Sequence, residues 1–371
     1  MKHVPLKDVC RITMGQSPAS SSYNAEGRGL PFFQGNADFG ERHPRTRLWC
    51  DAPSKIAHAG DILLSVRAPI GAVNLARETC CIGRGLAAVT PDPAKVFPLF
   101  AYWFLISKNP ELNRQGTGST FKAISKSIVE NIEIFVPDLP TQQRIASILE
   151  NLQTTLRLRR SQLSSLDTLV KARFVEMFGD PVVGNKNLQT ISSVGKIFTG
   201  NTPSMKEAAF YDSLDIPFVK PGNLAEHGVT RIENVETFVS EKARNTARIM
   251  PEGAILVTCI GTIGKIGIAT RECCCNQQIN FIVPNENINF VYLAHCLTFF
   301  VEKLKDMANA PVVPILNKTR FSSLKIPVPP LPLQNQFSSF VSQVERTKAT
   351  IRASLAETQR LFDSLMQEYF T

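Results

Sequence analysis

Apolar residues recur with coiled-coil spacing over residues 141–178. They return about every 3.5 residues for more than four heptads, which places one apolar stripe along a single face of a long helix. Such a stripe needs a second helix to cover it. The seam positions are Ile145, Leu149, Leu152, Leu156, Arg159, Leu163, Leu166, Val170, Arg173 and Met177. The pattern therefore predicts a long helix with a helical partner.

The partner is predicted at the end of the same chain, in residues 333–370. A shift of 192 residues reaches a second apolar seam of the same spacing, interrupted by Lys348 and Thr358. Its apolar members are Phe337, Val341, Val344, Ile351, Leu355, Phe362, Leu365 and Tyr369. Because the two seams match, we expect the two helices to form an intramolecular coiled coil.

The segments before the two predicted helices are also copies of one pattern. Residues 12–18 (ITMGQSP) return as residues 197–203 (IFTGNTP), and residues 134–142 (IFVPDLPTQ) return as residues 326–334 (IPVPPLPLQ). The offset drifts from 185 to 193 residues, as expected when loops between packed elements accept insertions. The chain is therefore predicted to be a pseudo-two-fold internal repeat.

Each copy combines a globular part with a long helix. In the globular parts, short apolar runs such as 61–66 and 255–260 are bounded by Gly, Pro, Asn and Asp, which indicates strands. A shorter helix is expected at 97–107 and at 290–306. The predicted fold class is α+β, with two mostly-β domains that carry small helices and two long helices between them. The predicted boundaries are 1–140 and 181–332 for the domains, and 141–180 and 333–371 for the helical regions.

Pro-rich junctions separate each domain from its helix. Residues 136–140 (VPDLP) and 328–332 (VPPLP) are expected to stay outside the helices, since proline lacks the N–H donor and disfavours helix at the residue before it. With the order globule, helix, globule, helix, antiparallel pairing is the simplest, with one globule at each end of a rod of about 55 Å. Parallel pairing, which brings both globules to one end, is the alternative.

Composition adds a polyanionic partner and a reducing compartment to this picture. The net charge is +9 with a pI near 9.1, which favours nucleic acid without proving it. The nine cysteines include adjacent ones and lack zinc-site spacing, so free buried thiols in a reducing cytosol are expected. There is no secretory apolar segment, and the longest apolar run, 97–106, is too short for a bilayer. A soluble cytoplasmic protein is expected.

Motifs of enzymes are missing from the sequence. Residues 261–266 contain Gly-Lys without the spacing of a phosphate-binding loop. Residues 83–88 match G-x-G-x-x-[GA], but they run into Val-Thr-Pro instead of opening a helix. The five histidines show no metal-ligand pairing, and the Asn-Pro-Pro-aromatic motif of amino-methyltransferases is missing. We therefore expect no catalytic residue, no cofactor and no metal.

The junctions and the end of the first helix carry a family resemblance. P-x-L-P-x-Q-Q-x-I at 137–145, P-x-L-P-x-Q at 329–334 and F-x-E-M-F-G-D-P at 174–181, together with the duplication, resemble the specificity (S) subunit of type I restriction-modification enzymes. The likeness covers the whole chain. One departure is that the second junction reads Gln334-Asn335 where the first reads Gln142-Gln143.

The resemblance implies a DNA-recognition subunit without an active site. Each domain would recognise one half of a split double-stranded DNA sequence, and the helices would dock two methyltransferase (M) subunits. Restriction translocase (R) subunits would join the full complex. Two alternatives stay open: part of a fused restriction-modification methyltransferase, and a coiled-coil adaptor that does not bind nucleic acid. The implied docking residues are Gln142, Gln143, Arg157, Arg160 and Gln334.

Candidate DNA contacts come from positions where the two copies differ. Arg67 corresponds to Ile260, and residues 83–85 (GRG) correspond to residues 276–278 (NQQ). Arginine can bind guanine with two hydrogen bonds in the major groove, and Asn or Gln can bind adenine in the same way. The candidate base readers are therefore Arg67, Arg84, Asn276, Gln277 and Gln278. The alternative is sequence drift in surface loops.

Further polar and basic residues in loops are candidates for phosphate contacts, which position a protein without reading sequence. A solvated surface is the alternative for each of them. The glycine-rich loop 116–120 is also expected to approach the DNA backbone. In the first copy the candidates are Gln34, Asn36, Arg42, Arg45, Arg47 and Lys122. In the second copy they are Lys220, Asn223, Lys242, Arg244, Arg248, Lys318 and Arg320.

Overall fold

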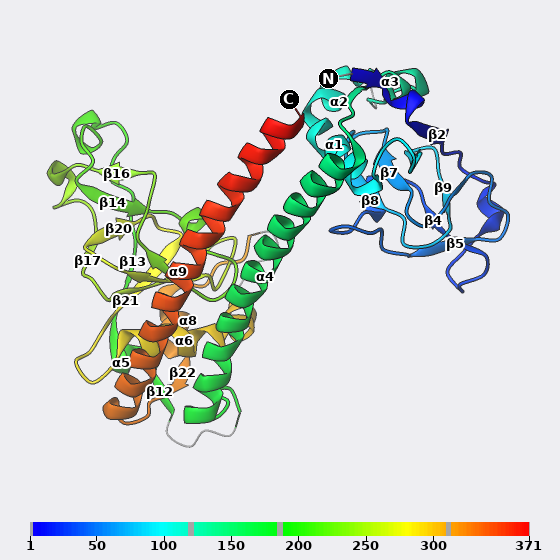
Figure 1. Cartoon of the computed structure of the whole chain (residues 1–371). Coiled ribbons are helices and arrows are strands. Elements are labelled where there is room, and N and C mark those ends of the chain that lie inside the picture. The colour runs from blue at the N-terminus through cyan, green and yellow to red at the C-terminus, as the bar shows by residue number, and fades with distance from the viewer. Residues whose placement is uncertain (1–2, 118–121, 184–187, 309–312, 371) are drawn as a thin grey trace. The chain divides into compact units, whose positions relative to one another are not determined.

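The computed structural model describes residues 3–117, 122–183, 188–308 and 313–370. The chain divides into two compact units (Figure 1). The first unit contains Met1–Arg159 and Ser354–Thr371, and the second unit contains Arg160–Ala353. Each unit therefore consists of one sheet-rich part together with one end of each long helix. Residues 118–120 of the glycine-rich loop lie outside the described residues.

The two predicted long helices are present as α4 (Leu139–Phe178) and α9 (Leu331–Phe370). Each begins two residues before its predicted start, so the expectation that the whole Pro-rich junction stays outside the helix is wrong for its last two residues. Proline is tolerated in the first turn of a helix because the N–H that it lacks would be unpaired there. Asp138 completes the start of α4, with its side chain accepting a 2.7 Å hydrogen bond from the backbone of Thr141.

Each unit pairs the start of one long helix with the end of the other. In the first unit, Leu149 near the start of α4 and Phe370 at the end of α9 belong to the same hydrophobic core. In the second unit, Phe174 near the end of α4 meets Phe337 near the start of α9, with ring centroids 5.3 Å apart. The predicted antiparallel pairing of the two helices is therefore confirmed.

The sheet-rich part of the first unit contains short strands and, among its described residues, three small α-helices. Its strands are β1 (His3–Pro5), β2 (Cys10–Met14), β3 (Tyr23–Asn24), β4 (Leu30–Phe33), β5 (Leu48–Cys50), β6 (Ile56–Ala57), β7 (Ile62–Ser65), β8 (Val73–Leu75), β9 (Cys80–Ile82), β10 (Leu86–Pro91) and β11 (Glu133–Phe135). Its small helices are α1 (Pro98–Ser107), α2 (Asn109–Gln115) and α3 (Lys126–Glu130). The sheets have the orders β2-β10-β7-β8, β3-β5-β4-β9-β6 and β1-β11.

The second unit repeats this plan. Its strands are β12 (Leu188–Thr190), β13 (Gly195–Thr199), β14 (Ile216–Val219), β15 (Val229–Ile232), β16 (Phe238–Val239), β17 (Ile249–Met250), β18 (Ile255–Thr258), β19 (Ile266–Ala269), β20 (Cys273–Cys275), β21 (Ile279–Pro284) and β22 (Lys325–Pro327). Its small helices are α5 (Ile191–Val194), α6 (Phe290–Thr298), α7 (Val301–Asp306) and α8 (Lys318–Ser323). The sheets have the orders β13-β21-β18-β19-β15, β16-β14-β20-β17 and β12-β22.

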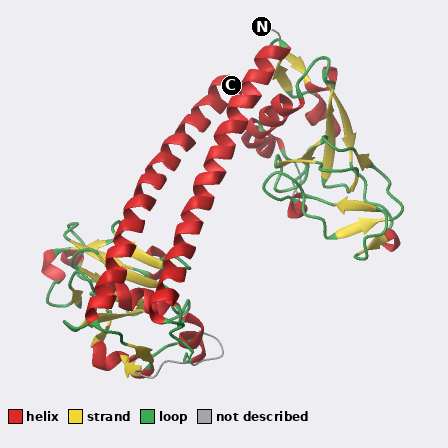
Figure 2. Cartoon of the chain, turned by 60° about the horizontal axis from the view of Figure 1, so that its bottom comes forward, coloured by secondary structure: helices red, strands yellow, loops and turns green. Residues whose placement is uncertain are grey.

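Matched strands pair in the same register in both units, which establishes the internal repeat at the level of structure. Val89 of β10 lies opposite Ile12 of β2, and Ile282 of β21 lies opposite Ile197 of β13. Figure 2 shows that the strands are short pieces joined by loops, whereas α4 and α9 are long and uninterrupted. The predicted α+β class with two sheet-rich domains and two long helices is confirmed.

One predicted helix is divided in two. The helix expected at 290–306 breaks between α6 and α7, where Phe299 and Phe300 bond to carbonyls three residues back. The tighter turn lets Phe300 enter the core, at 2% exposure, while Phe299 packs 4.9 Å from the ring of Phe174. Burial of these two rings accounts for the break. Among the described residues, none of the helices combines the length and the apolarity needed to span a bilayer.

Candidate nucleic-acid interface

A tight turn at residues 83–85 lies beside the ends of two strands in the first unit. The backbone N–H of Gly83 donates a 2.8 Å hydrogen bond to the carbonyl of Phe33, at the end of β4. The carbonyl of Gly85 accepts a 2.9 Å bond from Val66, just after β7. The backbone of this turn is therefore held from both sides, and the side chain of Arg84 at its centre is exposed.

The matched turn of the second unit, residues 276–278, is held by the same two bonds. The N–H of Asn276 donates to the carbonyl of Val219 at 3.3 Å, and the carbonyl of Gln278 accepts from Cys259 at 2.7 Å. Gln277 takes the central exposed position, and its side-chain oxygen accepts a 2.8 Å bond from the Thr202 hydroxyl. The two units therefore present different side chains from one shared backbone framework.

This turn explains why glycine occupies the matched positions Gly15 and Gly200 in the two copies. A Cβ on Gly15 would lie 2.1 Å from the carbonyl oxygen of Gly83, and a Cβ on Gly200 would lie 2.3 Å from that of Asn276. Neither distance is compatible with a side chain, because the obstructing atoms are backbone. Glycine at this position allows the chain to pass close to the turn directly after β2 and after β13.

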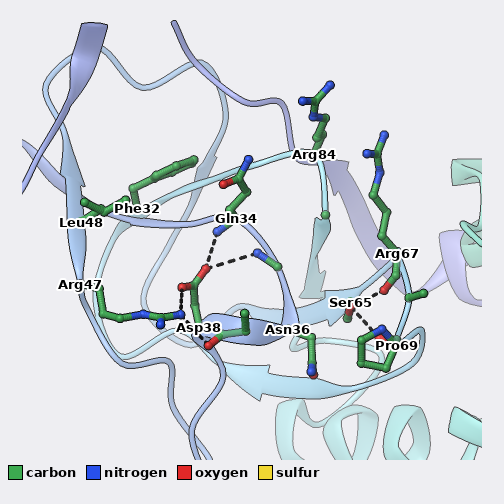
Figure 3. Close-up of a pocket in the computed structure, with 14 residues that line it drawn as sticks. Phe32, Gln34, Asn36, Asp38, Arg47, Leu48, Ser65, Arg67, Pro69 and Arg84 are labelled. Carbon is green, nitrogen blue, oxygen red and sulfur yellow. Dashed lines mark hydrogen bonds and ion pairs between the residues drawn. The ribbon is translucent and has the colours of Figure 1, made fainter. Parts of the chain in front are cut away.

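An open cleft of about 790 Å³ lies in front of the turn in the first unit (Figure 3). Its walls come from β4, the segment after β4, the turn and the loop after β7. The cleft lining brings together five of the predicted DNA contacts, which are Gln34, Asn36, Arg47, Arg67 and Arg84. In Figure 3 the side chains of Arg67 and Arg84 extend in the same direction from neighbouring loops. Both are exposed, and neither forms an ion pair with another described residue.

Asp38 organises the cleft, and sequence reasoning missed it. One carboxylate oxygen accepts hydrogen bonds from the backbone N–H groups of Gln34 at 2.7 Å and Gly35 at 3.3 Å. The other oxygen forms an ion pair with Arg47 at 2.8 Å. The same residue thus shapes the backbone after β4 and orients one cation of the cleft. The signal in the sequence was an Asp that could close a turn on backbone donors just upstream.

Asn223 plays the equivalent part in the second unit. Its side-chain oxygen accepts a 2.8 Å hydrogen bond from the backbone N–H of Lys220, directly after β14. The predicted candidates Lys220 and Asn223 are therefore close together, and Asn223 is a turn-forming residue. The Lys220 side chain is exposed and its ammonium lies 5.9 Å from the ring of Phe218.

Several predicted cations are engaged by acidic side chains. Arg42 forms an ion pair with Glu150 of α4. Lys242 pairs with Asp212 at 2.6 Å. Arg244 bonds to two carboxylates, those of Glu241 and Glu272, and these bonds raise the pKa of its guanidinium. Lys242 and Arg244 lie with these partners at the short turn 241–243. In the first unit, Arg45 and Lys122 are exposed and do not line the cleft.

Two further predicted cations lie near a partly exposed aromatic pair in the second unit. Phe198 stacks on Phe281 with centroids 5.2 Å apart, and the ammonium of Lys318 lies 5.8 Å from the Phe198 ring. Arg248 lines the adjoining cavity of about 290 Å³ and donates a 2.5 Å hydrogen bond to the carbonyl of Thr199. Arg320, from the same helix as Lys318, donates to the carbonyl of Met307 at 3.0 Å.

Two of the residues assigned to partner docking are internal. Gln142 and Gln334 are both fully buried. The Gln142 amide accepts from the backbone of Phe97 at 2.7 Å and donates to the carbonyl of Pro137 at 2.7 Å. Gln334 makes the matched bonds, to Asn289 at 2.9 Å and to Pro329 at 2.8 Å. The docking assignment of these two glutamines is therefore wrong, because their amides are used inside the chain.

The other docking candidates are on the surface of α4. The side chains of Gln143, Arg157 and Arg160 are exposed. Two leucines at matched positions of the long helices are also exposed, Leu169 of α4 at 47% and Leu361 of α9 at 50%. These two exposed apolar residues are related by the internal repeat, and each belongs to a different unit.

The cysteine side chains are internal. All nine are free and buried. Burial raises the pKa of most of them, for example to about 12 for Cys10 and for Cys296, so the reactive thiolate is disfavoured. The described residues contain no group of three or more His, Cys, Asp or Glu side chains that could hold a metal ion. The candidate site therefore offers guanidinium, amide and carboxylate groups for binding.

The family model described as "Type I restriction modification DNA specificity domain" matches residues 1–167 and again residues 185–359. The chain is 42% identical over 161 residues to the putative type I restriction enzyme MjaX specificity subunit of Methanocaldococcus jannaschii, which is 43% of this chain and 38% of that protein. It is 22% identical to the MjaIX specificity subunit of the same organism, over 97% of this chain and 90% of that protein.

Solved structures show the same fold. The S subunit of a type I restriction-modification system from M. genitalium superposes with a TM-score of 0.63 at 17% identity, covering 100% of this chain and 96% of that chain. A chain from a study of complex assembly and conformational transition of the type I R-M system gives a TM-score of 0.62 at 18% identity, covering 100% and 97%. Because the family model matches both copies and most of their length, this chain belongs to the type I restriction-modification DNA specificity family.

Proposed function

We propose that this chain is the DNA-recognition subunit of a type I restriction-modification complex, in which each unit reads one half of a bipartite target. The observation that carries the proposal is the matched turn at 83–85 and 276–278. Its backbone bonds are the same in both units, while its exposed side chains differ. A shared framework with different side chains is what recognition of two different half-sites requires.

The chemistry of the two turns favours different bases. Arg84 and the neighbouring Arg67 are exposed and unpaired among the described residues, which suits bidentate bonds to guanine. Gln277 and Asn276 carry amides, which suit adenine. The exposed cations Arg45, Lys122 and Lys220, together with a net charge of +9, are suited to phosphates. The chain itself is proposed to hold no active site.

The long helices are proposed to dock two methyltransferase subunits, one on each unit. Leu169 and Leu361 support this, because the internal repeat places an exposed leucine at the same helical position in both units. Gln143, Arg157 and Arg160 add polar groups to the exposed surface of α4. Two equivalent faces would accept two copies of one partner. Restriction subunits would join through that assembly.

Mapping of methylated adenines in the host genome tests the proposal. Single-molecule sequencing is done with the gene intact, with the gene deleted, and with the deletion complemented. Loss of methylation at one bipartite motif on deletion, and its return on complementation, is expected. Unchanged methylation would refute the recognition role. Methyl transfer to DNA by the isolated chain with labelled S-adenosylmethionine would instead favour a fused methyltransferase. Failure to bind DNA, with partner binding that does not weaken with added salt, would favour an adaptor.

A further inference from the structure

The segment between β4 and β5 forms one wall of the cleft in the first unit. It runs over residues 34–47, and we call it the recognition segment. Within it, the backbone of Arg45 bonds to the carbonyl of Asp38 at 2.8 Å, and that of Gly40 bonds to the carbonyl of His43 at 3.2 Å. These bonds, together with the turn at Asp38, stabilise the conformation of the segment from within. They do not by themselves fix where the segment lies on the rest of the unit.

Two contacts attach the recognition segment to the neighbouring strand. The buried side chain of Asn74 accepts a 3.1 Å bond from the backbone of Gly40 and donates a 3.2 Å bond to its carbonyl. The carbonyl of Arg42 accepts a 2.8 Å bond from the backbone of Leu75. This edge of the segment is therefore hydrogen-bonded to β8.

A third contact attaches the segment to the long helix. The guanidinium of Arg42 forms an ion pair with the carboxylate of Glu150 on α4, and it lies 5.8 Å from the centre of the Tyr102 ring on α1. Both charged side chains are largely covered, at 30% and 29% exposure. A partly covered, aromatic-backed Arg–carboxylate pair is a stronger tether than an exposed one.

The surroundings of Glu150 indicate that it serves Arg42. One of its oxygens bonds to Arg42, and the other is buried with no hydrogen-bond partner among the described residues. A largely buried carboxylate destabilises the fold unless it is paired. Glu150 is therefore tolerated at this position because Arg42 neutralises its charge. By contrast, Arg67 and Arg84 line the cleft, and Arg42 does not.

We propose that Arg42 and Glu150 are positioning residues, which hold the recognition segment against α4 so that the cleft keeps its shape. Arg42 then acts on target recognition through the cleft, and it does not touch DNA. This rests on the proposed function. The proposal departs from the prediction that Arg42 contacts phosphate. It also assigns a role in recognition to Glu150, a residue of the long helix α4.

Binding of a duplex tests the two roles against each other. The complex of the full chain with its methyltransferase subunit is titrated with a labelled duplex that contains the motif found by genome mapping, and with a scrambled duplex, at several salt concentrations. The variants are R42M, E150Q, the double variant, and R45M as a control from the same segment. Thermal unfolding of each variant checks that it is folded.

If the two residues position the segment, R42M and E150Q each weaken binding of the motif by about tenfold, and the double variant is no weaker than either single one. Their salt dependence stays that of the wild type. The charge-exchanged variant R42E/E150R recovers part of the affinity. R45M removes an exposed cation that is proposed to contact phosphate, so it should weaken binding of both duplexes alike and leave the preference for the motif unchanged.

A contact between Arg42 and phosphate gives a different pattern. R42M would then weaken both duplexes alike and reduce the slope of log K against log salt by about one charge, while E150Q would leave binding unchanged or strengthen it. That result would overturn the proposal while leaving the recognition role intact. If the wild-type complex itself shows no preference for the motif, the proposed function fails instead.

Discussion

The side-chain oxygen of Gln142 accepts a 2.7 Å hydrogen bond from the backbone N–H of Phe97, the residue that precedes helix α1. The same amide donates to Pro137, so one buried glutamine ties the start of a short helix to the junction that leads into α4. Gln334 makes the matched bonds in the second unit. The repeated glutamine is thus a structural clamp at both junctions.

Removal of either clamp should destabilise the chain. We expect Q142A and Q334A each to lower the free energy of unfolding by about 1–3 kcal/mol, because buried backbone groups lose their partners. Urea unfolding of the purified chain measures this. The control is Q143A, whose side chain is exposed and should change stability by less than about 0.5 kcal/mol. Equal effects of Q142A and Q143A would contradict the clamp.

Lys348, which interrupts the apolar seam of α9, forms ion pairs that offset the burial of its charge. Its ammonium is buried and bonds to Asp167 of α4 at 2.7 Å and to Glu345 at 2.6 Å. The matched position in the first unit is the buried Leu156. A buried ion pair often stabilises a protein no more than a packed apolar residue does, so K348L should leave the free energy of unfolding unchanged or raise it. K348A leaves a cavity, and its free energy of unfolding should be about 2 kcal/mol lower than that of K348L. A K348L chain that is clearly less stable than the wild type, measured by chemical unfolding, would show that the ion pair itself is required.

The turn at Asp38 should tolerate replacement of the carboxylate by an amide, but not removal of the side chain's oxygen acceptors. D38N keeps an oxygen for the backbone donors of Gln34 and Gly35, as Asn223 does for Lys220 in the second unit. We therefore expect D38N to lower affinity for the motif less than about threefold and D38A to lower it about tenfold. Fluorescence anisotropy with the methyltransferase complex measures both. Equal losses would mean that the ion pair with Arg47, and not the turn, is what matters.

The cysteines should be unreactive in the folded chain. All nine are buried, and burial raises the pKa of Cys80, Cys81, Cys273 and Cys274 to about 12. Near pH 8 the thiolate fraction is therefore small as well as inaccessible. A colorimetric thiol reagent should modify less than about one cysteine per native chain, and all nine after denaturation. Rapid reaction of several thiols under native conditions would show that the sheets open easily.

The long helices and the duplication were predictable from sequence, because they rest on the spacing of apolar residues and on repeated motifs. Their antiparallel pairing followed from the order of the globular and helical segments. The role of Gln142 was not, because a residue repeated in both copies fits a docking surface as well as a shared packing contact. The pairing of Arg42 with Glu150, and of Arg244 with Glu272, was not predictable either. Those partners meet only through the tertiary fold, and nothing local in the sequence marks them.

Exchange of one recognition domain tests most directly whether each unit reads one half of the target. Residues 1–140 are replaced by the matching domain of a relative with a different motif, and methylated adenines are mapped across the host genome by single-molecule sequencing. The account predicts that one half of the bipartite motif changes while the other half stays the same. A change in both halves, or in neither, would contradict it.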